Sequence, residues 1–135
     1  MLAAIPLTVV SLILYNAIAF GLGGGGADPW ASQILSIPML SGTRWSLPLG
    51  DLMITVAILM LFFEVMKSAR ASAATIADHI LSTLVLIAYV VEFIVVGAAA
   101  NSVFFILTVI ALFDVIAGFS ISIKTATRDI SIGRD

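Results

Sequence analysis

Long apolar runs that are almost free of charge constrain this chain more than any other feature. Four runs are long enough, or nearly so, to cross a bilayer as helices, which takes about 20 mostly apolar residues. They cover about residues 2–22, 50–68, 79–98 and 101–123. In hydrocarbon the backbone must pair its own polar groups, which only helices and closed β-barrels achieve. The runs lack the period-two alternation of barrel strands, so we expect helices. The sequence therefore predicts an all-α integral membrane protein, a four-transmembrane-helix bundle in one domain over residues 1–135.

Composition agrees with lipid as the solvent. The chain is 61% hydrophobic and 10% charged, whereas soluble domains carry about 25% charged residues. It has no cysteine and a net charge of −2, which excludes disulfides and thiol chemistry and gives no reason to expect a nucleic-acid partner. Too few residues remain outside the apolar runs for a soluble catalytic domain.

Sequence motifs for catalysis or cofactor binding are missing. The chain has no HExxH, Gly-x-Ser-x-Gly, P-loop or dinucleotide-binding pattern. Its one histidine, His79, lies at the start of a predicted helix, which is a poor position for a haem ligand. We therefore expect a protein that is not an enzyme, with no catalytic residues, no cofactor and no metal site.

The basic residues predict the orientation of the bundle. With four spans, five of the six Lys and Arg residues lie on one side, which the positive-inside rule assigns to the cytoplasm. Both termini are then cytoplasmic, in a bacterial-type inner (plasma) membrane. The first run lacks the basic leader of a signal peptide, so we expect it to stay as the first helix. The five residues are Lys67, Arg70, Lys124, Arg128 and Arg134.

The segment between the first two runs is the longest connection. Asp28, followed by proline, is a favourable helix start, and Pro38 is a favourable stop, so a short helix is expected over about residues 29–37. Its apolar side chains favour a position flat on the membrane surface. Trp30 and Trp45 are expected as interfacial anchors. A lid or a partner-docking surface is the alternative for this segment.

Two acidic residues lie inside apolar runs, where a charge is costly. Glu92 and Asp114 fall near the middle of the third and fourth runs, and neither run contains Lys or Arg. A charge there costs about 2.5 kcal/mol or more. If the two helices are antiparallel neighbours, the carboxyls differ in depth by under about 10 Å. Tyr89 lies on the same helix face as Glu92, and Asn16 at a similar depth. These four residues form the candidate buried polar or proton site.

Small and polar residues predict which helix faces pack together. In lipid, small residues let helices approach closely. One stripe surrounds the acid of the fourth run and another follows the first run. The first consists of Ala111, Ala117 and Gly118, and the second of Ala4, Thr8, Ser11, Tyr15 and Ala19.

Three roles remain open for the two acids, and they lead to two predicted functions. The acids can be neutral and hydrogen-bonded between helices, can carry a proton or cation, or can bind a cofactor or lipid headgroup drawn into the membrane. The first role predicts a small accessory or structural subunit. It would contact lipid and either dock on a larger inner-membrane complex or assemble with copies of itself. The alternative is an oligomeric proton- or cation-coupled channel or transporter that uses Glu92 and Asp114.

Overall fold

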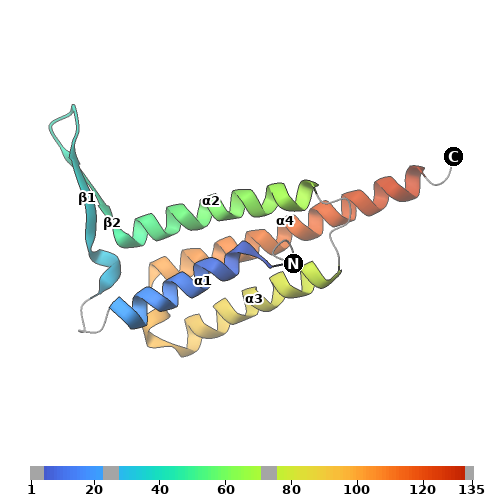
Figure 1. Ribbon diagram of the computed structural model, residues 1–135, viewed down its shortest axis with the longest axis horizontal. Helices are drawn as coiled ribbons and strands as arrows, with labels where there is room; N and C mark the ends of the chain where they lie inside the picture. The colour runs from blue at the N-terminus through green and yellow to red at the C-terminus, as the bar shows by residue number, and fades with distance from the viewer. Residues whose placement is uncertain (1–4, 23–27, 71–75, 133–135) are drawn as a thin grey trace.

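The computed structural model describes residues 5–22, 28–70 and 76–132. Within these residues four α-helices form a bundle and a two-stranded hairpin extends from one end of it. The helices are α1 (Leu7–Ala17), α2 (Leu49–Arg70), α3 (Ile76–Val95) and α4 (Ser102–Ile132). Figure 1 shows that α1 and α3 run toward the hairpin, whereas α2 and α4 run away from it.

Three of these helices are long and apolar enough to cross a membrane. The apolar stretches are Leu49–Ala69, Ala77–Val95 and Ser102–Ile121, and they indicate a multi-pass membrane protein. The fourth apolar stretch, Leu7–Gly21, is shorter. It comprises α1 and a π-helical turn, η2 (Ile18–Leu22). The beginning of the predicted first span, residues 1–4, lies outside the described residues.

The connections at the two ends of the bundle differ. A single 3-10 turn, η4 (Gly97–Ala99), reverses the chain between α3 and α4. Asn101 then caps α4, because its side-chain oxygen accepts from the Phe104 backbone N–H at 3.0 Å. At the opposite end α4 continues past its apolar stretch and projects beyond the bundle (Figure 1). We call the end that carries the hairpin the hairpin end. We call the opposite end the Lys67 end, after the basic residue near the end of α2.

The helix predicted over residues 29–37 is wrong. Its first part is a 3-10 turn, η3 (Pro29–Ala31), and the remainder forms a strand, β1 (Gln33–Pro38). β1 pairs antiparallel with β2 (Arg44–Pro48). The hairpin extends across the direction of the helices and past α2 (Figure 1).

Tertiary pairing explains why a strand forms here. Ile37 lies opposite Trp45, and an apolar β-branched residue beside an aromatic one stabilises a strand pair. The reversal is made at Gly42, whose φ of 89° a residue with a side chain rarely adopts. A backbone bond of 2.9 Å from Met39 N to Thr43 O closes the turn. The apolar residues of this segment therefore lie in a β-strand rather than on one face of a helix.

The bundle core is built around one aromatic residue of α4. Phe104 is 0% exposed. Its ring centroid lies 4.8 Å from that of Tyr15, 5.4 Å from that of Tyr89 and 6.4 Å from that of Phe93. It therefore joins α1, α3 and α4 at one point, while many large apolar side chains on the outer faces remain exposed.

Candidate functional site

The polar face of α1 lies inside the bundle. Thr8, Ser11 and Tyr15 are 3%, 2% and 1% exposed. Their spacing of three and four residues places them on one helix face. α1 also meets an acidic residue of each of the other three helices, through the Leu7 N–H, Thr8 and Asn16, so α1 organises the polar interior.

Glu64 of α2 holds the beginning of α1. One carboxylate oxygen, Oε2, accepts from the backbone N–H of Leu7 at 3.2 Å and from Nζ of Lys67 at 3.1 Å. Lys67 also donates to the carbonyl of Ile5 at 3.2 Å. The first N–H groups of a helix have no partner within the helix, so this carboxylate satisfies one of them and complements the helix dipole. The pair therefore fastens α1 to α2 at the Lys67 end.

Asp114 of α4 is buried beside this pair. The residue is 5% exposed, and the charges of Glu64 and Lys67 act on its carboxyl. The Thr8 side chain of α1 is near enough to the Asp114 carboxyl to interact with it by hydrogen bonding. In the described part of the chain, Asp114 Oδ2 and Thr8 Oγ1 are both buried and neither has a hydrogen-bond partner of good geometry. Unsatisfied buried polar atoms are rare in folded proteins, so this pair of atoms calls for an explanation.

Glu92 of α3 has different neighbours from Asp114. Its Oε2 accepts from Nδ2 of Asn16 at 3.2 Å, and the same amide also donates to the Leu12 carbonyl at 3.0 Å. Asn16 immediately precedes the last residue of α1, where the helix continues as the π-helical η2. The two acids therefore belong to separate groups of residues, in which Glu92 contacts Asn16 and Asp114 lies next to Thr8.

Tyr89 does not donate to Glu92, although the two share a helix face. Its hydroxyl donates to the Thr8 carbonyl at 2.7 Å, and the residue is 1% exposed. A phenol has one proton to donate. Tyr89 therefore ties α3 to α1 next to the Asp114 group.

A polar cluster at the hairpin end joins α1 to the short turn before α4. The Tyr15 hydroxyl donates to the Ala98 carbonyl at 2.7 Å and accepts from Nδ2 of Asn101 at 2.6 Å. Trp30 stacks on the Tyr15 ring at a centroid distance of 4.5 Å. Trp30 is 5% exposed, because this stacking covers its ring, and its role as an interfacial anchor stays a prediction. Trp45 is 44% exposed on β2.

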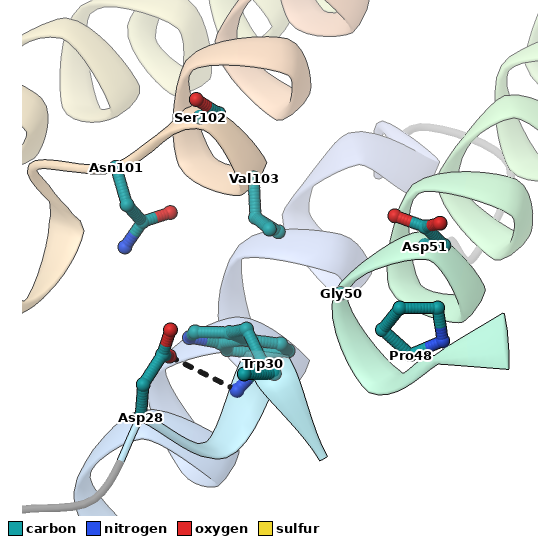
Figure 2. Close-up of a pocket in the computed structure, with 9 residues that line it drawn as sticks. Asp28, Trp30, Pro48, Gly50, Asp51, Asn101, Ser102 and Val103 are labelled. Atoms are coloured by element: carbon teal, nitrogen blue, oxygen red, sulfur yellow. Dashed lines mark hydrogen bonds between the residues drawn. The ribbon is translucent and has the colours of Figure 1, made fainter. Parts of the chain in front are cut away.

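An open pocket of about 350 Å³ lies beside this cluster. Figure 2 shows the side chains of Asp28 and Asn101 directed toward each other at its edge, with Trp30 beside Asp28 and Asp51 across the pocket. Asp28 Oδ1 already accepts from the Trp30 backbone N–H at 3.1 Å. A Cβ at Gly50 would lie 2.7 Å from a methyl group of Val103, so the wall behind the pocket is closely packed.

The two predicted packing stripes are placed as follows. Thr8, Ser11 and Ala111 are buried. Gly118 faces His79, whose Nδ1 would lie 3.4 Å from an added Cβ. Ala117 is partly buried. Ala4 lies outside the described residues.

The sequence analysis did not include Glu64 among the residues of the candidate polar site. The i,i+3 spacing indicates its pair with Lys67, and the structure contains that pair. Nothing in the sequence indicates that the pair lies beside Asp114, because this requires α1, α2 and α4 to meet. Tyr15 and Asn101 are a second example, since their bond joins residues 86 positions apart.

The arrangement supports proton binding and hydrogen bonding between helices. Among the residues that the structure describes, no group of three His, Asp or Glu side chains could hold a metal ion. Comparison with protein-family models, with curated proteins and with solved structures finds no match for this chain, so its function has to be inferred from its own residues.

Proposed function

We propose that this protein is a small, non-enzymatic integral membrane subunit that docks on a larger membrane complex or assembles with copies of itself. The hairpin carries the proposal. Apolar side chains are exposed on both of its strands and on its turn, and Leu40 at the turn is fully exposed. A two-stranded hairpin is at best marginally stable by itself in water, so such a surface calls for a covering partner.

The direction of the hairpin supports a neighbour beside α2. It extends across the helix axes and past α2 (Figure 1). With α2 crossing the bilayer, the hairpin would lie along the membrane surface over whatever adjoins that helix. The outer face of α2 is itself apolar, with Phe62 and Phe63 exposed at 58% and 61%. A neighbouring transmembrane helix would then contact α2 within the membrane and the hairpin above it.

Polar substitutions on the hairpin should release the partner. The triple variant Ile34→Thr, Ile37→Thr and Leu40→Ser keeps β-forming residues on the strand but removes the exposed apolar surface. After extraction of native membranes into lipid nanodiscs, we expect wild-type protein in a larger assembly and the triple variant as a monomer. Native electrophoresis and mass photometry measure the difference.

A matched control changes polar residues of the same hairpin. The variant Ser36→Thr with Ser46→Thr, whose side chains lie opposite each other in the hairpin, should assemble as the wild type does. The docking proposal fails if wild type, triple variant and control all migrate as monomers. It fails equally if the triple variant stays in the assembly, since the hairpin then only contacts lipid.

The alternative function is an oligomeric proton- or cation-coupled channel or transporter. The burial of Asp114 without a hydrogen bond at Oδ2 favours it. This function requires flux through liposomes that contain the purified protein, and the double variant Glu92→Gln with Asp114→Asn should abolish the flux. Absence of proton or cation flux under an imposed gradient, from protein that is shown to be folded, would exclude the alternative.

A further inference from the structure

We propose that Asp114 is a proton-binding site, completed by Thr8 and the Glu64–Lys67 pair, and that its proton is exchanged with the Lys67 end of the bundle. This inference stands apart from the docking proposal, because it concerns the interior of one chain. Assembly and carboxyl protonation are measured separately, so either proposal can fail while the other holds.

The charges around Asp114 leave one negative charge without a counter-charge. Lys67 is 3.1 Å from Glu64, so these two charges neutralise each other. No charged side chain of α1 faces the site within the described residues. An ionised Asp114 would therefore add an uncompensated charge inside the membrane, which is costly. A proton on its carboxyl removes that charge.

The two buried atoms without partners support the same conclusion. A protonated carboxyl has one O–H to donate, and a threonine hydroxyl can accept it. The bound proton would therefore let Asp114 Oδ2 and Thr8 Oγ1, which lack partners of good geometry, satisfy each other. The hydroxyl could also donate to an ionised carboxylate, but that arrangement keeps the charge.

A metal cation fits this site less well than a proton. Hard cations such as Ca²⁺ take about 6–8 oxygen ligands. Glu64 Oε2 already accepts from two donors, one of them a cation. Asp114 and Thr8 then supply too few oxygen atoms for a closed coordination shell.

Neighbouring residues make access one-sided. Toward the hairpin end, Phe104 and Leu107 of α4 are 0% and 1% exposed and fill the core. Toward the other end, the side chains of Glu64 and Lys67 are 7% and 32% exposed, so exposure rises away from Asp114. Protons would thus reach the acid past this pair.

Residues of α3 supply further titratable groups near the site. Tyr89 donates to the Thr8 carbonyl. His79 stacks on Phe119 at a centroid distance of 4.7 Å and packs against Gly118, one turn along α4 from Asp114. His79 is therefore at the Lys67 end and is a necessary control for any titration of the site.

Infrared spectroscopy of the full chain in nanodiscs tests the proton directly. We expect a carbonyl band of a protonated carboxyl that Asp114→Asn removes, while Glu92→Gln and His79→Gln leave it in place. Thr8→Val keeps the acid and should shift the band, because the hydrogen bond is lost. Glu64→Gln should reduce the band at a given pH, because Lys67 is then free to neutralise an ionised Asp114.

Sidedness can be tested because the chain contains no cysteine. A single cysteine, Ser68→Cys, is placed at the Lys67 end, and Ala100→Cys at the hairpin end serves as the matched control. A bulky thiol reagent at residue 68 should slow deuterium exchange of the carboxyl proton several-fold, and the same reagent at residue 100 should not. Equal exchange rates for the two labelled proteins would overturn the one-sided access.

Three results would overturn the proposed proton site. One is a spectrum with no band that depends on Asp114 at any pH at which the protein is folded. Another is a band that disappears on addition of Na⁺ at constant pH, which would identify a cation site. If Asp114→Asn did not fold, an unshifted band in Thr8→Val would also refute the proposal.

Discussion

Replacing Phe104 with alanine should destabilise the bundle by about 3 kcal/mol. Its ring is 0% exposed and contacts aromatic rings of α1 and α3, so truncation leaves a cavity that no lipid chain can fill. We take the lower end of the range for Phe→Ala, because lipid is as apolar as the core and the loss is mainly one of packing. SDS-induced unfolding in mixed micelles, followed by tryptophan fluorescence and circular dichroism, measures the loss.

Phe113→Ala is the matched control for this variant. Phe113 lies on the same helix but is 55% exposed. Its removal should change the unfolding free energy by less than about 0.5 kcal/mol, as for most exposed substitutions. Equal stability losses in the two variants would contradict the placement of Phe104 at the centre of the bundle.

Replacing Glu64 with alanine should cost about 2 kcal/mol, below the usual range for a broken buried ion pair because Lys67 is partly exposed. The variant loses the acceptor of the Leu7 N–H and leaves the Lys67 ammonium without its carboxylate. The beginning of α1 is then released from α2. Hydrogen–deuterium exchange over the first turn of α1, together with SDS unfolding, measures the effect.

Two further variants distinguish the causes of this loss. Glu64→Gln keeps an acceptor for the Leu7 N–H and should lose less stability than Glu64→Ala. The double variant Glu64→Ala with Lys67→Ala removes the unpaired ammonium and should recover part of the lost stability. A double-mutant cycle measures this coupling between the two residues. If the two substitutions simply add, Glu64 and Lys67 are not energetically coupled.

The long apolar helices were predictable because hydropathy is a local property. The spans predicted at about 50–68, 79–98 and 101–123 correspond to α2, α3 and α4, although α4 continues to Ile132. Each is long and apolar, and in lipid the helix is the structure that satisfies its own backbone. The first apolar stretch is shorter within the described residues and ends as a π-helix.

The hairpin was not predicted because each of its strands is stabilised by pairing with the other, which a local sequence pattern does not show. Asp28 and the following proline do start a helical turn, but it ends at Ala31. The next residues form a strand only when Ile37 lies opposite Trp45 and the chain reverses at Gly42. The sequence feature that could have indicated the turn is Gly42 between Ser41 and Thr43, and a single glycine between polar residues is weak evidence for a hairpin turn.

By itself, the sequence determined that this chain has long apolar segments, that these segments form helices long enough to cross a membrane, and that Glu92 and Asp114 lie inside two of them. These properties depend on composition and on contiguous residues. Only the tertiary structure decided the partners of the acids. It joins Glu92 to Asn16 across 76 positions, and it places Asp114 beside Thr8 and the Glu64–Lys67 pair. The spacing of small and polar residues indicates which face of a helix is packed, as for Thr8, Ser11 and Ala111. It does not indicate which other helix that face meets, because the partner is selected by tertiary packing.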